Sequence, residues 1–429
     1  MAVLLVKPSK LSGEITAPPS KSYTHRAFMI ALLADGESTI KDPLIGYDTM
    51  ATIEAVKELG AEVTREDNVW RVRGTGGRIR PRTGVIDARN SGTTIRLMSA
   101  IAAIADMPTR LTGDKSILQR PMGPLVKTLK ELGAKARCEG KEGRPPVIVG
   151  GGLEGGNVEI TGDISSQFIS ALLFATPHAK WDVSITITGE MRSKPYVEIT
   201  LELLKMAGAK IKHDDRLTKF SIPGGQTLKP INLTIPGDFS SAAFPLGAAA
   251  LTGSTVKVNN LDVNGAQGDR RIVTLLKEFG AEVKVFKNAV EVSGEGELSG
   301  IEADCGDNPD LVPVLAVLGS VADGRTRLMN IPHLRFKETD RLRALATELR
   351  RLGADVEELP DELKIYGVKH LKGAKLSSYG DHRMAMAFTL AGLVARGETT
   401  VDGAESIPVS YPTFVDDMRK LGAKIELRD

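Results

Sequence analysis

The sequence predicts an α/β fold built from six copies of a unit that has two helices and short strands. A Gly-Ala pair followed by a charged residue returns at intervals of about 70 to 75 residues, from Gly60-Ala61 to Gly422-Ala423. Each pair ends an amphipathic run and precedes a strand-like stretch, which is the pattern of a helix, a glycine cap and a strand. A second series of six runs is apolar almost all round and therefore predicts buried helices.

The two series of helices alternate along the chain. The capped helices end at Leu59-Gly60, Leu132-Gly133, Ala207-Gly208, Phe279-Gly280, Leu352-Gly353 and Leu421-Gly422. The buried helices are expected over residues 27–34, 95–105, 168–175, 242–251, 311–321 and 384–394. Each buried helix follows a short polar opening, where Ser, Asp and Asn suit helix N-caps. Six buried helices therefore imply six buried N-termini that carry different polar groups.

Proline and glycine interrupt the pattern at two places where we expect the chain to cross between domains. These places are Ala17-Pro18-Pro19-Ser20 and residues 230–237. With both crossings, the first strand joins the C-terminal half of the chain. We therefore predict a discontinuous domain I over residues 1–18 and 236–429 and a domain II over residues 19–235, each with three repeat units.

Composition excludes several classes of function. The 56 Lys and Arg residues nearly balance the 54 Asp and Glu residues without a long basic run, so we expect no nucleic-acid partner. The longest apolar stretches fall short of the ~20 residues that cross a bilayer, so we expect no membrane partner. Two distant cysteines, Cys138 and Cys305, suit a reducing cytoplasm. No spacing of His and Cys residues indicates a metal, and a strand-like stretch follows the glycines at 150–155 instead of a nucleotide-binding helix.

Two helix openings and one loop in the first half of the chain carry groups suited to anions. Lys21, Ser22 and Arg26 lie at successive turns of one helix start, where free backbone N–H groups already favour phosphate or carboxylate. Gly92 lets a ligand approach the backbone at another helix start. Arg120 stands just ahead of a helix that we expect to start at the next proline, and its guanidinium fits the same anions. The alternatives are a capped helix with a solvated basic face, a turn glycine and a surface arginine.

Two further openings offer neutral and acidic groups. Ser165, Ser166 and Gln167 present two hydroxyls and an amide that are able to hold phosphate or sugar-like hydroxyls. Asp310 opens an otherwise apolar helix, whose dipole would keep the carboxylate ionised and ready to accept a proton. Simple helix capping is an equally good interpretation of both openings.

Charged residues also gather in the last two units. The segment from Arg335 to Arg343 alternates in charge, which by itself is more typical of a solvated helix face. His382-Arg383 is consistent with a satisfied pair at a helix start. The repeat favours a functional role over these structural interpretations. Nearly every polar cluster falls at the same point of its unit, so the fold should bring the clusters close together. Six unlike polar ends indicate an active site more than a scaffold.

Six motifs combine these residues: Pro19-Ser20-Lys21-Ser22, Asn90-Ser91-Gly92-Thr93, Arg120-Pro121-Met122, Ser165-Ser166-Gln167, Lys337-Glu338-Thr339-Asp340-Arg341 and Asp381-His382-Arg383. In these motifs the chain closely resembles the 5-enolpyruvylshikimate-3-phosphate synthases, also called 3-phosphoshikimate 1-carboxyvinyltransferases. The resemblance runs in order from about Lys7 to Phe414. It implies the inside-out α/β barrel of the enolpyruvyl transferases: two similar domains, each with three βαβαββ units around buried parallel helices, and an active site in the cleft between them.

The resemblance also implies a reaction. The enolpyruvyl group of phosphoenolpyruvate moves to the 5-hydroxyl of shikimate 3-phosphate through a tetrahedral intermediate, and phosphate is released. This is the sixth step of the shikimate pathway, which leads to chorismate and the aromatic amino acids. The implied partners are these two small molecules, with no metal, no cofactor and no covalent enzyme intermediate, and we expect a cytoplasmic monomer.

Roles follow from the same resemblance. The implied catalytic residues are Lys21, Asp310 as the base and Glu338 as the acid. The residues implied for shikimate 3-phosphate are Lys21, Ser22, Arg26, Ser165, Ser166, Gln167, Ser193, Asp310 and Lys337. Those implied for phosphoenolpyruvate are Lys21, Gly92, Arg120, Gln167, Arg341 and Arg383, with Asn90, Thr93 and His382 as possible support.

Two positions depart from the family pattern. Some relatives carry a lysine just before the closing aromatic-Pro motif, where this chain has Val409-Ser410, and His333 stands where others often carry asparagine. One rival is UDP-N-acetylglucosamine 1-carboxyvinyltransferase, which commonly has a loop cysteine where this chain has Lys115. The other is a non-catalytic repeat scaffold, which predicts similar exposed residues in every unit.

Overall fold

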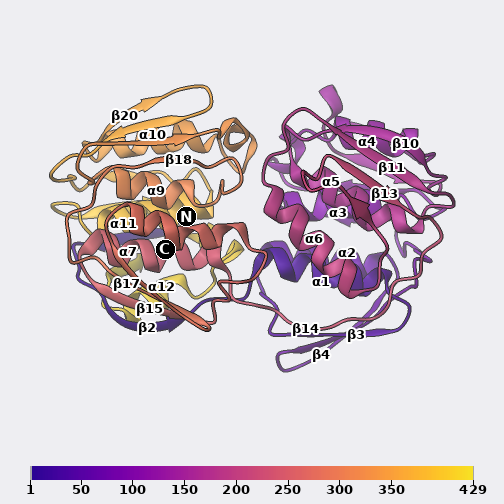
Figure 1. Cartoon of the computed structure of the whole chain (residues 1–429), viewed down its shortest axis with the longest axis horizontal. Helices are drawn as coiled ribbons and strands as arrows, with labels where there is room; N and C mark the ends of the chain where they lie inside the picture. Colours follow the sequence, from indigo (N-terminus) through magenta and orange to yellow (C-terminus); the bar gives the residue numbers. More distant parts are fainter. Residues whose placement is uncertain (1, 429) are drawn as a thin grey trace. The chain divides into compact units, whose positions relative to one another are not determined.

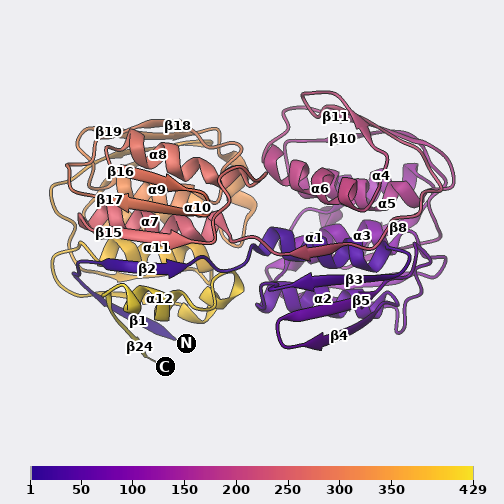
Figure 2. The same ribbon diagram turned by 60° about the horizontal axis from the view of Figure 1, so that its bottom comes forward.

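The computed structural model describes residues 2–428, and contacts along the chain divide it into two compact units. Unit 2 contains Pro19–Ile235, and unit 1 contains the chain up to Pro18 and from Pro236 onward. The indigo strands β1 (Val3–Lys7) and β2 (Ser12–Thr16) therefore lie with the orange and yellow elements of unit 1 (Figure 2). β1 pairs antiparallel with β23 (Thr399–Asp402) and β24 (Lys424–Arg428), so the two ends of the chain share one sheet.

Unit 2 holds three sheets and six α-helices. Its strands are β3 (Glu37–Lys41), β4 (Glu62–Glu66), β5 (Val69–Arg73), β6 (Val85–Asp87), β7 (Thr109–Thr112), β8 (Lys135–Cys138), β9 (Val147–Gly150), β10 (Gly156–Thr161), β11 (Val183–Thr188), β12 (Lys212–His213), β13 (Lys219–Ile222) and β14 (Asn232–Thr234). Its helices are α1 (Lys21–Leu33), α2 (Tyr47–Glu58), α3 (Gly92–Ala102), α4 (Gly123–Glu131), α5 (Ser166–Ala175) and α6 (Lys194–Met206).

Unit 1 repeats this plan. Besides β1, β2, β23 and β24, its strands are β15 (Thr255–Asn259), β16 (Glu282–Phe286), β17 (Ala289–Ser293), β18 (Glu302–Asp304), β19 (Arg325–Met329), β20 (Asp355–Glu358), β21 (Leu363–Tyr366) and β22 (Lys375–Leu376). Its helices are α7 (Phe239–Thr252), α8 (Ile272–Glu278), α9 (Val312–Gly319), α10 (Arg341–Arg351), α11 (His382–Gly392) and α12 (Phe414–Lys420).

The six sheets of residues 2–428 each have four strands in the same arrangement. In the sheet β6-β7-β9-β8, β6 pairs parallel with β7, and β9 pairs antiparallel with β7 and β8. In four of the sheets the strands of the parallel pair are joined through a buried helix, because parallel neighbours require a crossover connection. Two sheets borrow their first strand from a distant segment: β2 pairs parallel with β15, and β14 pairs parallel with β3. The predicted α/β fold of six two-helix units is confirmed.

The cores of both units are made by the apolar helices. Every residue of α7, α9 and α11 is buried, and these three helices pack against one another inside unit 1 (Figure 1). In unit 2, α3 packs against α5, and α1 packs against α2 and α6. The six predicted buried helices are therefore confirmed. Within residues 2–428, none of the helices combines the length and apolar character that a membrane crossing needs.

The Gly-Ala pairs end the second series of helices, as predicted. Gly60 has a φ of 110°, and the N–H of Ala61 donates to the carbonyl of Val56 across the end of α2. The same bond runs from Ala134 to Leu129, Ala209 to Leu204, Ala281 to Leu276, Ala354 to Leu349 and Ala423 to Met418. This is the Schellman arrangement, in which glycine takes the left-handed conformation and the next residue closes the turn. It turns the chain from each helix into an outer strand.

A different glycine sets the distance between two buried helices. A Cβ atom at Gly247 of α7 would lie 2.5 Å from Cγ1 of Val314 in α9, closer than side chains pack. We predict that Gly247→Ala destabilises the protein by about 1–3 kcal/mol, because the methyl group overfills a close-packed core.

Val314→Ala removes the atom that the new methyl group meets. In urea unfolding, the double variant should lose at least ~1 kcal/mol less than the sum of the single variants. Additive losses of stability would show that the methyl group added at Gly247 does not clash with Val314.

Candidate active site

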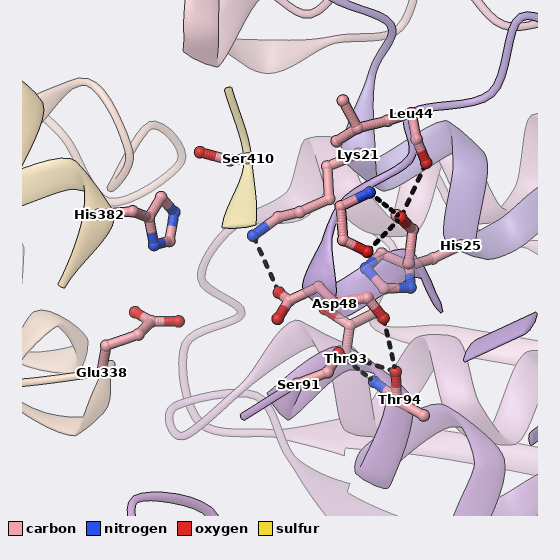
Figure 3. A network of polar contacts seen from close by, with 12 residues as sticks. Lys21, His25, Leu44, Asp48, Ser91, Thr93, Thr94, Glu338, His382 and Ser410 are labelled. Atoms are coloured by element: carbon pink, nitrogen blue, oxygen red, sulfur yellow. Dashed lines mark hydrogen bonds and ion pairs between the residues drawn. The ribbon is translucent and has the colours of Figure 1, made fainter. Parts of the chain in front are cut away.

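The first predicted opening places Lys21 beside an acidic residue of the next helix. Lys21 is the first residue of α1, and its Nζ lies 3.2 Å from Oδ2 of Asp48 in the first turn of α2. Figure 3 shows the lysine side chain extended toward this carboxylate. Lys21 and Ser22 are the residues of α1 that are not fully buried. The cation at this helix start is therefore oriented by Asp48, which the sequence analysis missed.

Arg26 faces the interior instead. Its Nε donates to Oγ1 of Thr200 at 2.8 Å, while Nη1 and Nη2 donate to the carbonyls of Ser22 and Tyr196. Burial lowers the pKa of Arg26 to about 10, against the opposing effect of Tyr196 and Tyr23. The guanidinium therefore fastens the start of α1 to α6, and the interpretation as a solvated basic face is wrong for Arg26.

A buried chain of hydroxyls connects α1 to the start of α3. Nδ1 of His25 lies 2.7 Å from Oγ1 of Thr52, which lies 2.7 Å from Oγ1 of Thr94. Thr94 in turn donates to Oγ of Ser91, the N-cap of α3 (Figure 3). Burial, reinforced by the charges of Lys21 and Arg26, lowers the pKa of His25 well below its usual value. The imidazole is therefore neutral, and the chain fixes the helix start without charge.

Gly92 stands at the first position of α3 because an arginine occupies the space next to it. A Cβ atom there would lie 2.2 Å from Nη1 of Arg120. Arg120 is buried, and its Nη2 is 3.5 Å from Oγ of Ser116. The expectation that Pro121 starts a helix is wrong: α4 begins at Gly123, after a short 3-10 helix η1 (Ile117–Gln119) and an extended Arg120. This extended backbone is what carries the guanidinium toward Gly92.

Gln167 joins α5 to α3 in the same unit. Its Nε2 donates to Oγ1 of Thr93 at 2.9 Å, and its Oε1 accepts from Nη1 of Arg96 at 2.8 Å. Ser165 is the N-cap of α5 and accepts from the N–H of Gln167, so this opening is also a helix cap. Unit 2 therefore brings Gln167 and Thr93 into direct contact. Arg96, on the same helix as Gly92, was missed as a site residue.

The remaining predicted residues of unit 2 lie at other starts and turns. Asn90 donates from Nδ2 to Oδ2 of Asp114 at 2.6 Å. It takes no part in the hydrogen bond between Gln167 and Thr93. Ser166 is buried in the first turn of α5. Ser193 precedes α6 with a φ of 57°, a left-handed conformation that is uncommon outside glycine. A strained serine ahead of a helix is a frequent feature of functional sites.

Unit 1 gathers three carboxylates on one guanidinium. Arg341 is the first residue of α10 and only 1% exposed. Its Nε donates to Oδ2 of Asp381 at 2.8 Å, its Nη1 to Oδ1 of Asp310 at 2.9 Å, and its Nη2 to Oε2 of Glu338 at 2.8 Å. Burial alone would lower the pKa of Arg341, but the charges of Asp381, Glu338 and Asp310 outweigh it and raise the pKa. Two predicted catalytic carboxylates are therefore held by one cation.

Asp310 lies between two arginines. Its Oδ2 is 3.0 Å from Nη2 of Arg383, in the first turn of α11, and its Oδ1 faces Arg341. The residue precedes α9 by two positions, so it does not open that helix as we expected. The negative charge of Asp310 is therefore compensated by two guanidinium groups. Their hydrogen bonds stabilise the carboxylate more than a helix dipole would at this distance.

The charged segment before α10 is not a solvated helix face. Lys337 and Glu338 precede the helix, and Asp340 is its N-cap, accepting from the N–H of Arg343 at 3.1 Å. His382 opens α11 and is buried, with Nδ1 3.9 Å from Oδ1 of Asp381. The interpretation of Arg341 as a surface charge is therefore wrong, because the helix begins at that residue and turns it inward.

Of the residues that depart from the family pattern, His333 and Ser410 are buried and Val409 is partly buried. His333 lies in the 3-10 helix η5 (Pro332–Phe336). Ser410 follows the 3-10 helix η6 (Ala404–Val409), and its carbonyl accepts from Oγ of Ser241 at 3.4 Å.

Comparison with known proteins gives one consistent result. Residues 5–418 match the family model described as EPSP synthase (3-phosphoshikimate 1-carboxyvinyltransferase). Curated relatives with the name 3-phosphoshikimate 1-carboxyvinyltransferase include those of Methanocaldococcus jannaschii, 47% identical over all of both chains, and Methanosarcina acetivorans, 49% identical over 98% of both. The solved structure of EPSP synthase from Acinetobacter baumannii superposes with a TM-score of 0.84 at 28% identity and covers all of both chains. The chain belongs to the EPSP synthase (3-phosphoshikimate 1-carboxyvinyltransferase) family.

Proposed function

We propose that the chain transfers the enolpyruvyl group of phosphoenolpyruvate to the 5-hydroxyl of shikimate 3-phosphate and releases phosphate. Membership of the family along almost the full length supports this reaction. The observation in the structure that carries it is the contact of Asp310 and Glu338 with one buried guanidinium, at 2.9 Å and 2.8 Å. An addition followed by an elimination needs a base and an acid of this kind in fixed positions.

The proton movements follow from these two carboxyl groups. Asp310 takes the proton of the 5-hydroxyl as the oxygen bonds to C2 of phosphoenolpyruvate, and Glu338 gives a proton to C3. The tetrahedral intermediate then loses a methyl proton to Glu338 as the bond from C2 to the phosphate oxygen breaks. The proton on Asp310 leaves with the phosphate group. Lys21 stabilises negative charge on the oxygen that departs.

Both substrates carry several negative charges, and the proposed contacts match them. For shikimate 3-phosphate we propose Lys21, Ser22, Arg26, Ser165, Ser166, Gln167, Ser193, Asp310 and Lys337. For phosphoenolpyruvate we propose Lys21, Gly92, Arg120, Gln167, Arg341 and Arg383, with Asn90, Thr93 and His382 in support. Arg26 stays in the first set because Nη1 and Nη2 each carry a second N–H group beyond those that bind Ser22 and Tyr196.

We also propose that the active site lies in a cleft between the two units and that the protein is a cytoplasmic monomer. The resemblance and the composition support these proposals. The near balance of 56 basic and 54 acidic residues supports small anionic substrates over a nucleic-acid surface.

The most direct test is phosphate release from the purified protein with phosphoenolpyruvate and either shikimate 3-phosphate or UDP-N-acetylglucosamine. We expect release with shikimate 3-phosphate alone, with the enolpyruvyl product identified by mass spectrometry. Release with the nucleotide sugar alone would replace the proposed function with that of the rival transferase. No release with either acceptor would favour a binding scaffold.

The roles of the two carboxyl groups are tested by Asp310→Asn and Glu338→Gln. Each variant should lower kcat by roughly 10²- to 10⁴-fold, the usual effect of removing a positioned base or acid. The fold should persist, because Asp381 still binds two nitrogens of Arg341. Glu362→Gln is the matched control, since it removes a mostly buried carboxylate from Arg327 in the same unit. Normal turnover in both Asp310→Asn and Glu338→Gln would refute the assignment.

The contact of Gly92 with Arg120 predicts a selective loss of substrate affinity. Gly92→Ala places a methyl group 2.2 Å from the present position of Nη1, so the guanidinium must move. We expect KM for phosphoenolpyruvate to rise about tenfold or more, and more than KM for shikimate 3-phosphate. Gly123→Ala is the control, because Gly123 begins α4 and its added Cβ would lie 3.6 Å from the nearest atom. An equal rise in both KM values would contradict the placement of Arg120.

A further inference from the structure

A buried carboxyl group with no part in the proposed mechanism lies in the core of unit 1. Asp269 belongs to the 3-10 helix η4 (Gly268–Arg271) and is 4% exposed. Its Oδ2 accepts from Oγ of Ser240 at 2.5 Å, and its Oδ1 is 3.5 Å from Nδ2 of Asn308. Ser240 is in the first turn of α7, and Asn308 precedes α9. Both of these partners are neutral, so they orient the carboxyl group without compensating its charge.

The charged groups around Asp269 come from three other elements. Asp238, the N-cap of α7, and Asp310, ahead of α9, both act on it with negative charge, while Arg383 of α11 acts with positive charge. On its own element, Arg271 is turned toward the carbonyl of Asp304 and Oδ1 of Asn308. Burial raises the pKa of the neighbouring Cys305 to about 12, so this thiol stays neutral. Asn308, whose Nδ2 contacts Asp269, precedes Asp310 by two residues, so the two carboxyl groups belong to one cluster ahead of α9. Asp310 is the proposed catalytic group whose charge opposes that of Asp269.

The balance of these effects places the ionisation of Asp269 close to neutrality. Burial and then the charge of Asp310 raise the pKa of Asp269 to about 7, while Ser240 and Arg383 act in the opposite direction. Repulsion between two carboxylates is mutual, so an ionised Asp269 also makes Asp310 hold a proton more strongly. Asp310 also faces two guanidinium groups, with its carboxylate oxygens 2.9 Å from Arg341 and 3.0 Å from Arg383.

We propose that Asp269 is a positioning residue that acts through Asp310: fixed by Ser240 and Asn308, its carboxylate offsets the two arginines and makes Asp310 a base strong enough to take the substrate proton. The inference rests on the proposed function, because it assigns no contact with substrate to Asp269. The active form has both carboxyl groups ionised. The two groups titrate as a pair, and this titration forms the acid limb of the rate profile.

The first test is the pH profile of kcat for Asp269→Asn, Ser240→Ala and the control Glu362→Gln. In Asp269→Asn, kcat on the plateau should fall about tenfold, and the acid limb should move to lower pH by about one unit or more, because Asp310 alone ionises easily beside two arginines. In Ser240→Ala the limb should move to higher pH, since a hydrogen bond that favours the ionised form is lost. Glu362→Gln should leave the limb in place.

A merely structural role predicts a different outcome, in which kcat falls and the acid limb stays at the wild-type pH. That result in both Asp269→Asn and Ser240→Ala would overturn the inference. If Asp269→Asn does not fold, the shift in Ser240→Ala alone decides, and a limb that stays or moves to lower pH there counts against the proposal.

A second measurement does not depend on turnover. The pKa of Asp269 is higher in the folded protein than the ordinary value near 3.9, so its contribution to stability is present below about pH 4 and is lost as the pH rises through about 7. The urea midpoint of the wild type should therefore fall between pH 5 and pH 8 by more than that of Asp269→Asn, and equal falls would overturn the inference. The wild type could show the larger fall in urea midpoint and yet have no turnover. That result would contradict the proposed function and the catalytic role of Asp269, but it would leave the raised pKa of Asp269 standing.

Discussion

Where the buried helices α1, α3 and α5 reach the surface, they do so only at their first turn. The bodies of these helices are enclosed by sheets and by other helices, so a polar group there needs a partner inside the protein, as Ser99 has in the carbonyl of Ile95 and Ser170 has in Thr200. At the first turn, free backbone N–H groups donate hydrogen bonds to polar and acidic side chains. In α1, α3 and α5, the residues that escape full burial are Lys21, Ser22, Thr93 and Gln167, all in that turn. The same rule that builds the core therefore decides where chemistry is possible.

The two units hold the first turns of their buried helices with different kinds of interaction. Unit 2 fixes its helix starts largely with neutral groups: a hydroxyl chain runs from His25 to Ser91, and an amide joins Gln167 to Thr93. Unit 1 uses charge, with Arg341 and Arg383 distributed over Asp310, Glu338 and Asp381. Lys21 of unit 2 is paired with Asp48, whereas in unit 1 two guanidinium groups hold the carboxyl groups of Asp310 and Glu338 in defined positions. This division suits a reaction that binds two anions and moves protons between them.

The repeat explains how much the sequence could predict. The Gly-Ala pairs and the apolar runs depend on local conformation and burial, and both series of helices were correctly located. Contacts between segments far apart in the chain could not be predicted, such as Arg120 against Gly92 or Asp381 against Arg341. The helix expected at Pro121 was wrong, because a proline that fits a first turn equally fits the extended chain that the structure has there. Asp48 and Thr52 had a detectable signal, since they are polar residues four positions apart on the buried face of α2.

The central claim is that Asp310 and Glu338 carry out an addition and an elimination, in which C3 of phosphoenolpyruvate becomes a methyl group for part of each turnover. The measurement that tests it most directly is turnover in D₂O with shikimate 3-phosphate, with the product examined by mass spectrometry and proton NMR. The account predicts deuterium at the methylene carbon of the enolpyruvyl group. A product formed in D₂O with only protium at that carbon would contradict it, because C3 would then never have accepted a proton.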